Sequence, residues 1–282
     1  MKAEFKGNPL IEIPKNIPSY NFLTGDFGEE VLEEYNSKVK QYYQDNSNLK
    51  VFNLNNGIVT GSNSYSIFPM FEILSKYGLR NANPADVQKI INKDKDFLRG
   101  VYVDLGLVLR TENSPNEYLA MQLSKQAKDR KYEFSDSYPL VFKSSDLELI
   151  ADNNSRSGLG FKIKESATPF NAPELSHKNY SKKFKITNEN GVPVFDKNGN
   201  RTNYTQDNGL SRFYLGRYSG LDSRNDGLAG LDGGFGRVVV LNDAEGVAPK
   251  IFESDLKQAK DKYLNSLKEL QKRIDSEIKQ NQ

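Results

Sequence analysis

The residue types that most often carry enzymatic or metal-ion chemistry are scarce in this chain. It contains no Cys, and His177 is the single His among its 282 residues. Thiol nucleophiles, disulfides, thiolate zinc sites, iron–sulfur clusters and sites that need two histidines are therefore excluded for this sequence. His177 stands in an Asn-, Lys- and Ser-rich stretch that offers no visible partner to orient it as a general base. We interpret it as an ordinary surface histidine, and we expect no catalytic residue, no metal ligand and no cofactor.

A short polar run, residues 196–200 (DKNGN), follows the pattern that opens a calcium-binding loop. Such a loop needs Gly at its sixth position and Glu at its twelfth. Here those positions hold Arg201 and Asp207, so the run favours a β-turn over a calcium site.

Two other patterns could suggest chemistry. The glycine cluster at 227–236 precedes a β-like run and contains no Lys, whereas a phosphate-binding loop precedes a helix and carries Lys followed by Ser or Thr. Asp104 and Asp86 could each be half of a carboxylate pair, but nothing in the sequence fixes their separation. Solvated or hydrogen-bonded roles are therefore favoured for both carboxylates.

Composition and charge limit the class of protein and its partners. Hydrophobic residues make up 37% of the chain, enough for a core, and 39 basic residues against 37 acidic ones leave a net charge of +2. This balance argues against a nucleic-acid binder. No apolar run is long enough to span a membrane, and residues 1–20 lack the apolar stretch of a secretory signal peptide. We expect synthesis in the cytoplasm, with display on a virion left open.

The periodicity of apolar residues predicts an α+β chain. Residues 1–25 read as an irregular arm, and 250–282 contain an amphipathic helix that docks on the body or on a partner chain. We predict helices at 26–45, with Asp26 as its N-cap, and at 69–78, 114–130 and 252–280. A further helix is predicted to start at Asn83 as N-cap, with Pro84 in the first position and Val87, Ile90 and Ile91 facing inward. We predict strands at 49–54, 100–109, 138–142 and 159–163, and a hairpin over 184–195. In the first helix Val31, Leu32, Tyr35, Val39, Tyr42 and Tyr43 are expected on one inward face.

Residues 207–237 differ in composition from the rest of the chain. Lys, Glu and Gln account for 56 of the 282 residues, yet none occurs in this segment. About six would be expected, and on independent draws their absence is roughly a one-in-a-thousand event. The segment is rich in Gly, but a flexible linker would not carry its regularly placed leucines or continue directly into the β-like run 237–241. The leucines indicate anchors separated by interchangeable residues.

The genetic code offers an explanation for these two classes of position. If the intervening codons began as the asparagine codon AAC and each adenine could become any base, Lys, Glu, Gln, Met and Trp would be unreachable. Asn, Asp, Tyr, Ser, Gly, Arg, Ala, Phe, Leu, Val, Thr and His would be reachable. Every residue between the anchors belongs to the reachable set.

This pattern resembles the variable region of target proteins of diversity-generating retroelements, with a framework similar to archaeal and archaeal-virus members. The resemblance covers about 207–241 and implies a C-type lectin fold, here over 49–249, with added N-terminal (1–48) and C-terminal (250–282) helical segments. It implies that the variable positions bind ligand: Phe213, Gly216, Tyr218, Ser219, Gly220, Asp222, Arg224, Asn225, Asp226, Gly227, Ala229, Gly230, Asp232, Gly233 and Phe235. The structural framework would be Leu210, Arg212, Leu215, Arg217, Leu221, Leu228, Leu231 and Arg237, with the arginines bound to carboxylates or backbone carbonyls.

The function expected from this resemblance is non-enzymatic recognition of a macromolecule, a protein or another cell-surface component, through a hypervariable surface. Two alternatives remain at this point. One is a virion structural or attachment protein in which 207–237 is an ordinary loop, and the other is an enzyme with an Asp/Arg/Tyr pocket. Two functions of lectin-like folds are disfavoured: the chain lacks the Glu-Pro-Asn and Trp-Asn-Asp motifs of calcium-dependent sugar binding and the cysteines of formylglycine-generating enzymes.

Overall fold

The computed structural model describes residues 19–224, 227–230 and 234–242, which belong to one compact unit ending at Asp243. The predicted helix at 252–280 lies outside the described residues. So do five of the positions singled out in the sequence: Asn225, Asp226, Leu231, Asp232 and Gly233.

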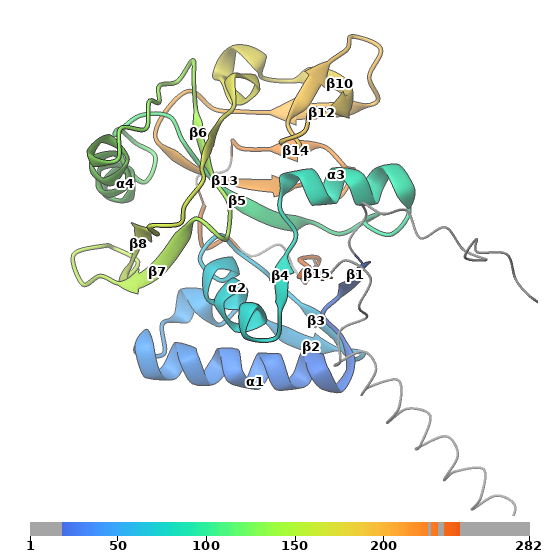
Figure 1. Cartoon of the computed structure of the whole chain (residues 1–282), viewed down its shortest axis with the longest axis vertical. Helices are drawn as coiled ribbons and strands as arrows, with labels where there is room; N and C mark the ends of the chain where they lie inside the picture. Colours follow the sequence, from blue (N-terminus) through green and yellow to red (C-terminus); the bar gives the residue numbers. More distant parts are fainter. Residues whose placement is uncertain (1–18, 225–226, 231–233, 243–282) are drawn as a thin grey trace, which may run out of the picture. The chain divides into compact units, whose positions relative to one another are not determined.

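The described residues form four α-helices and fifteen β-strands (Figure 1). The helices are α1 (Gly25–Tyr42), α2 (Ile67–Lys76), α3 (Pro84–Lys93) and α4 (Glu117–Asp129), with short 3-10 turns η1 (Ser47–Leu49), η2 (Pro173–Leu175) and η3 (His177–Asn179). The strands in the first half are β1 (Ser19–Phe22), β2 (Asn53–Asn55), β3 (Ile58–Thr60), β4 (Leu79–Asn81), β5 (Val103–Leu109), β6 (Leu140–Phe142) and β7 (Leu147–Ala151). Those in the second half are β8 (Leu159–Ile163), β9 (Phe170–Asn171), β10 (Lys182–Thr187), β11 (Pro193–Phe195), β12 (Arg201–Tyr204), β13 (Leu210–Leu215), β14 (Leu221–Asp222) and β15 (Val239–Asn242).

The largest element is a curled eight-stranded sheet with the strand order β11-β10-β12-β14-β13-β5-β6-β9. Its neighbouring strands are antiparallel except for the parallel pair β12 and β14. Strand β5 is buried along its whole length, as a central strand must be. Gly106 within it has φ of +146°, and a Cβ there would lie 1.9 Å from the carbonyl oxygen of Phe142 on β6. Only glycine permits this close approach of the two strands.

Helix α3 covers the apolar face of the large sheet. The predicted start of this helix is confirmed: Asn83 accepts a hydrogen bond from the backbone N–H of Asp86, whose side chain accepts one from Asn83 in return. Pro84 occupies the first helical position. The buried face of α3 joins a core that includes residues of β5, β13, β14 and β15.

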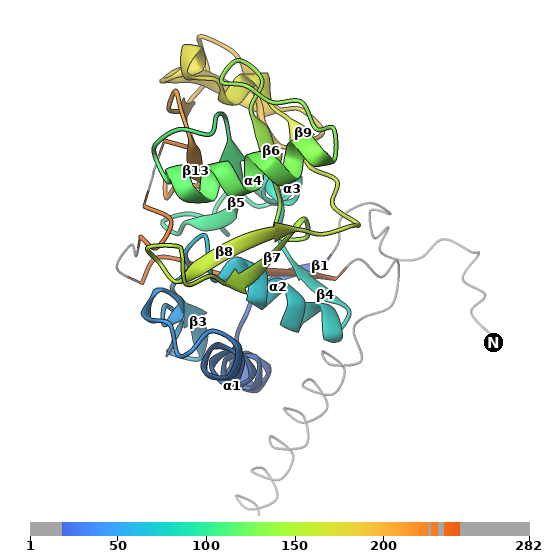
Figure 2. The same cartoon turned by 90° about the vertical axis from the view of Figure 1, so that its left-hand side faces the viewer.

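A second layer contains α1, α2, the hairpin β2–β3 and a three-stranded sheet in the order β1-β15-β4. In both views this layer lies at the end of the unit away from β10 and β12 (Figures 1 and 2). Helix α1 packs against α2 and β3, so the described part of segment 1–48 is an integral layer of the unit. Figure 2 also shows α4 beside the hairpin β7–β8, with which it is in contact.

Two details of the predicted first helix are wrong. Its N-cap is Thr24, not Asp26, and the helix begins at Gly25. Tyr42 is exposed, whereas Tyr43 is buried. The buried residues of this helix recur every four positions, and Tyr43 continues that series from Val39, so Tyr42 projects from the adjacent, solvated face.

The mixed architecture, with four helices and a curled eight-stranded sheet in the described residues, is compatible with the expected α+β class. Among the helices that the structure describes, none combines the length and the apolar character needed to cross a bilayer.

Candidate recognition surface

The unusual segment 207–237 enters the large sheet and then folds back over it. Strand β13 pairs with β5, and after a tight turn β14 pairs with both β13 and β12. In the turn, the backbone N–H groups of Gly216 and Ser219 donate to the carbonyls of Gly220 and Gly216, each over 2.8 Å. The buried Arg201 on β12 donates from Nε to the carbonyl of Ser219 over 2.6 Å. Arg201, which lies outside segment 207–237, therefore stabilises the turn between β13 and β14.

The leucine positions of the framework are buried wherever the structure describes them. Leu210, Leu215 and Leu221 have no exposed surface, and Leu228, in the loop that follows β14, is also buried. The N–H of Ser64 donates to the carbonyl of Leu228 over 3.1 Å, which ties this loop to the start of α2. The Gly-rich part of the segment is thus held by a buried leucine and by a hydrogen bond from the turn that precedes α2.

Arg212 and Asp104 form a buried ion pair under this loop. Their side chains are 3% and 0% exposed, and Nε and Nη2 of Arg212 donate to Oδ1 and Oδ2 of Asp104 over 2.5 and 2.8 Å. The guanidinium lies 4.8 Å from the ring centres of both Tyr102 and Tyr214. Burial alone would lower the pKa of Arg212, but the Asp104 carboxylate outweighs it and raises that pKa. Arg212 also donates to the carbonyl of Gly230 over 3.2 Å, so the pair holds the loop as well as the sheet.

Arg110 is a second buried guanidinium, and nothing in its sequence context singles it out. It donates to the hydroxyl oxygens of Ser211 and Ser223 over 2.8 Å each and to the carbonyl of Leu175 over 2.9 Å. Burial lowers its pKa to about 10, against the opposing charges of Asp136 and Asp207. Arg110 therefore links β5 and β13 to the start of the loop after β14.

The other two framework arginines make different contacts. Arg237 donates from Nη1 to the carbonyls of Gly234 and Gly236 over 2.6 and 2.7 Å. Arg217 was expected to bind a carboxylate or a carbonyl, but its guanidinium lies 3.7 Å from the ring centre of Phe235 and its Nε has no hydrogen-bond partner in the described residues. No described carboxylate forms an ion pair with Arg217, so the aromatic ring takes that place.

The predicted variable positions divide into exposed and buried ones. Tyr218 is 91% exposed, Phe235 is 38% exposed, and Arg224 is also on the surface. Ser219, Ala229 and Gly216 are partly exposed, and Gly227 is exposed. These side chains and backbone positions can meet a partner.

Phe213 was predicted as a contact residue, and that prediction is wrong. Its side chain is fully buried and belongs to the core between the large sheet and α3. Strand β13 alternates its side chains between two faces, and Phe213 shares the inward face with Leu215. The genetic-code argument admits Phe at any position and cannot identify this alternation.

Asp222 is also buried, and it affects the surface only by positioning Arg224. It accepts hydrogen bonds from the backbone N–H of Arg224 over 3.0 Å and from Nε of the same residue over 3.1 Å. Burial raises the pKa of Asp222, and the hydrogen bonds from Arg224 and Tyr214 oppose that rise. Asp222 thus positions Arg224 at the surface and is not itself displayed.

Two glycines among the predicted variable positions have little room for a side chain. A Cβ at Gly220 would lie 2.9 Å from the carbonyl oxygen of Thr202, and one at Gly230 would lie 2.9 Å from that of Gly227. At Gly216 the nearest atom would be 3.5 Å away, an ordinary contact. Gly216 can therefore be replaced by residues with a side chain without rearrangement. At Gly220 and Gly230 the neighbouring backbone would have to move first.

Sequence reasoning missed two tyrosines beside this surface. The guanidinium of Arg224 lies 4.3 Å from the ring centre of Tyr204 on β12, and its Nη1 lies 3.5 Å from Oη of Tyr180. The two rings meet edge to face with centres 6.0 Å apart. Because the contacts join residues that are 20 or more positions apart in the chain, no local motif could have indicated them.

The remaining chemical candidates have structural roles. Asp86 caps α3 and forms an ion pair with Arg80. Asp196 accepts a hydrogen bond from the N–H of Asn198 in a turn, as the sequence favours. His177 is exposed, but it has a partner that the sequence did not reveal, since its Nδ1 lies 2.6 Å from Oδ2 of Asp136. In the described residues no three His, Cys, Asp or Glu side chains converge as metal ligands would.

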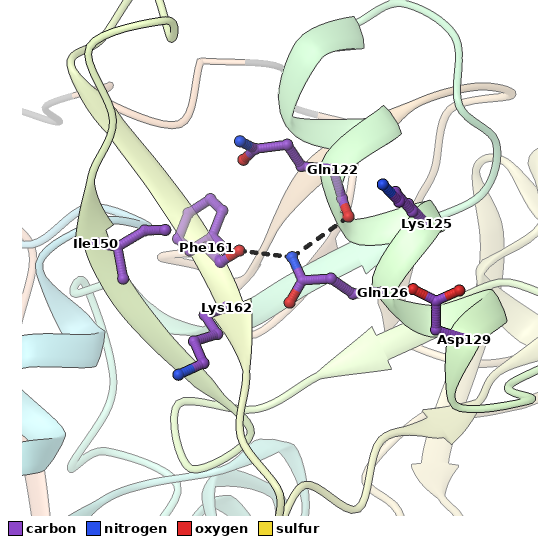
Figure 3. A pocket seen from close by; sticks show the side chains of 7 residues that line it. All are labelled: Gln122, Lys125, Gln126, Asp129, Ile150, Phe161 and Lys162. Atoms are coloured by element: carbon purple, nitrogen blue, oxygen red, sulfur yellow. Dashed lines mark hydrogen bonds between the residues drawn. The ribbon is translucent and has the colours of Figure 1, made fainter.

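A shallow groove of about 360 Å³ lies between α4 and the hairpin β7–β8 (Figure 3). It is lined by Gln122, Lys125, Gln126, Asp129, Ile150, Phe161 and Lys162. Gln126 links α4 to β8 within the groove by donating to the carbonyl of Phe161 over 2.8 Å (Figure 3). None of its lining residues belongs to segment 207–237, so the groove gives no support to an enzyme with an Asp/Arg/Tyr pocket in that segment.

Comparisons with protein-family models, with curated proteins and with solved structures found no match to this chain.

Proposed function

We propose that this chain is a non-enzymatic binding protein whose segment 207–237 displays exchangeable residues to a macromolecular ligand. In this proposal the segment is the variable region of a diversity-generating retroelement target carried on a C-type lectin fold. The ligand is a protein or another cell-surface component, and the protein acts in the cell or as part of a virion.

The observation that carries the proposal is the division of roles inside one segment that lacks Lys, Glu and Gln. The described leucines and Arg212 are buried and bonded to other elements. Tyr218, Arg224 and Phe235 project from the same stretch of chain into solvent. A rigid framework that carries exposed, replaceable side chains is what a diversified recognition site requires, because surface substitutions rarely change stability by more than about half a kcal/mol.

The exposed residues are also suited to recognition. Tyr and Arg combine a large apolar area with directed polar groups, and they dominate the energetics of many interfaces. Arg224 and Arg217 are pre-oriented by stacking on aromatic rings, which lowers the conformational entropy lost on binding. Phe213 and Asp222 are buried and are not proposed as contact residues. Phe213 packs in the core, and Asp222 positions Arg224.

The proposal is tested by two small libraries of matched size. One exchanges Tyr218, Arg224, Ala229 and Phe235 for residues reachable from AAC codons, and the other makes the same exchanges at Phe213, Leu215, Leu221 and Leu228. Soluble expression and thermal midpoint are measured for every member.

We expect most members of the first library to melt within a few degrees of the parent and most of the second to be insoluble. Each large-to-small change in the second library costs about 2–5 kcal/mol, and the whole stability of a domain is about 5–15 kcal/mol. If the two libraries lose stability to the same extent, the proposed division of roles is refuted.

A further inference from the structure

Arg201, the first residue of β12, is a buried side chain with a hydrogen-bond donor to spare. Only 8% of the residue is exposed, and its guanidinium lies 4.5 Å from the ring centre of Phe184 on β10. Its Nε donates to the carbonyl of Ser219 and its Nη1 to Oε1 of Gln88 on α3, each over 2.6 Å. Its Nη2 is shielded from solvent and has no hydrogen-bond partner in the described residues.

Gln88 has a free donor beside that of Arg201. A guanidinium carries donors only, so Gln88 must turn its side-chain oxygen toward Arg201 and its NH2 group elsewhere. Gln88 is 3% exposed, and its Nε2 likewise has no partner in the part of the chain that the structure describes. Two buried donor groups, on side chains in direct contact, therefore lack an acceptor.

Arg201 also lacks a counter-charge. Among the described residues it forms no ion pair with a carboxylate, whereas the buried Arg212 is paired with Asp104 and two carboxylates favour the charged form of Arg110. Burial lowers the pKa of Arg201 to about 10, and no neighbouring charge opposes this shift. The guanidinium is still protonated at neutral pH. Buried charges in proteins are normally paired, because an unpaired charge is costly to remove from water.

We propose that Arg201 and Gln88 form an internal site for a small inorganic anion of the halide class, such as chloride. A halide accepts hydrogen bonds from both free donors and neutralises the guanidinium. A water molecule supplies an acceptor but no charge. Because both donor atoms are shielded from solvent, the site favours a monatomic anion over a phosphate or an organic carboxylate.

The site adjoins the turn that displays Tyr218. The guanidinium that binds the ion also holds the carbonyl of Ser219, whose φ of +62° is uncommon for a residue other than glycine. Tyr218, the preceding residue, is 91% exposed. A bound ion therefore fixes the side chain that stabilises this turn. Arg201 and Gln88 both lie outside segment 207–237, so the site does not depend on the proposed function.

The first test follows the thermal midpoint of the full chain while chloride replaces gluconate, a large organic anion, at a constant sodium concentration of about 100 mM. Gln88→Glu keeps the shape of the side chain and supplies a carboxylate to Arg201. The matched control is Gln126→Glu on α4, because both polar atoms of Gln126 are already bonded, to the carbonyl of Phe161 and to the N–H of Ile163.

We expect the midpoint of the parent to rise with chloride and then to level off. At a chloride concentration of about ten times the Kd, the folding equilibrium constant increases about tenfold and the midpoint by about 3–6 °C. The control should retain this rise. Gln88→Glu should melt above the parent in gluconate and show no rise, since its carboxylate takes the place of the ion. A parent that does not respond to chloride, or an equal rise in Gln88→Glu, would overturn the assignment.

The second test locates the ion in crystals of the full chain grown in sodium bromide and measured at the bromine absorption edge. We expect an anomalous peak between Nη2 of Arg201 and Nε2 of Gln88. A water molecule or a carboxylate of the chain itself at that position, or bromide confined to surface lysines, would contradict the proposal. Segment 207–237 is unchanged in both variants, so either result leaves the library test of the proposed function unaffected.

Discussion

Replacing Arg212 by Ala tests whether the buried ion pair under the variable segment is its main support. The change removes both hydrogen bonds to Asp104 and the one to the carbonyl of Gly230. The side chain of Asp104 is fully buried, and its carboxylate would keep the hydrogen bond that the hydroxyl of Ser62 donates over 2.5 Å.

Breaking a buried pair from one side costs about 3–5 kcal/mol, because the remaining charge is left uncompensated in the interior. That is a large fraction of a total stability of about 5–15 kcal/mol. Arg212→Lys retains the charge but cannot form the two-pronged contact, and its cost should be about 1–3 kcal/mol.

The assay is urea denaturation followed by far-UV circular dichroism, with Asp104→Ala and the double variant completing a thermodynamic cycle. Arg217→Ala is the matched control, since that arginine stacks on Phe235 and forms no ion pair in the described residues; it should cost about 1 kcal/mol or less. If Arg212→Ala fails to fold, Arg212→Lys supplies the value. A loss below about 1 kcal/mol for Arg212→Ala, or strict additivity with Asp104→Ala, would refute the reasoning.

Three further predictions follow from the burial of individual positions. Phe213→Ala should cost about 3–5 kcal/mol and Phe235→Ala about 1 kcal/mol or less in the same urea assay; similar losses would contradict the assignment of one ring to the core and the other to the surface. Gly220→Ala should lower the thermal midpoint while Gly216→Ala leaves it within a few degrees, because a Cβ at Gly220 would lie 2.9 Å from a backbone carbonyl oxygen, whereas the nearest such oxygen to a Cβ at Gly216 is 3.5 Å away; the reverse order would contradict this difference in contact. Because burial raises the pKa of Asp222 above 3.8, its contribution to stability is present at low pH and lost as the pH rises through the folded-state pKa. The thermal midpoint of Asp222→Asn should therefore rise relative to that of the parent between about pH 3 and pH 6, and a constant or falling difference would contradict this sign.

The sequence predicted those parts of the fold that local patterns determine. Asn83 and Pro84 located the start of α3, and alternating apolar residues located β5. The hairpin over 184–195 was also predicted, since its two strands are close in the chain and joined by a turn.

The parts that depend on distant pairing could not be predicted. Strand β14 has two residues and lies beside β12 only because the turn after β13 returns the chain to that position. The contacts of Tyr204 and Tyr180 with Arg224 therefore depend on the tertiary structure, and no short stretch of the sequence could predict them. The same limit applies to Arg110, whose partners Leu175, Ser211 and Ser223 come from three separate segments.

For the candidate site, composition identified the right kind of segment but not the direction of each side chain. Codon reachability treats Phe213 and Phe235 alike, yet one is in the core and the other is on the surface. The alternation of strand β13 and the backbone contact at Gly220 supply the missing distinction.

The most direct measurement of the central claim is deep sequencing of the gene across the population that carries it. We expect substitutions to be concentrated at the codons of Tyr218, Arg224, Ala229 and Phe235, and the codons of Leu215, Leu221 and Arg212 to be nearly constant. We also expect a second copy of the segment beside a reverse-transcriptase gene, with adenines at the codons that correspond to the substituted positions. Substitutions spread evenly over segment 207–237 and the rest of the gene, with no such copy nearby, would contradict it.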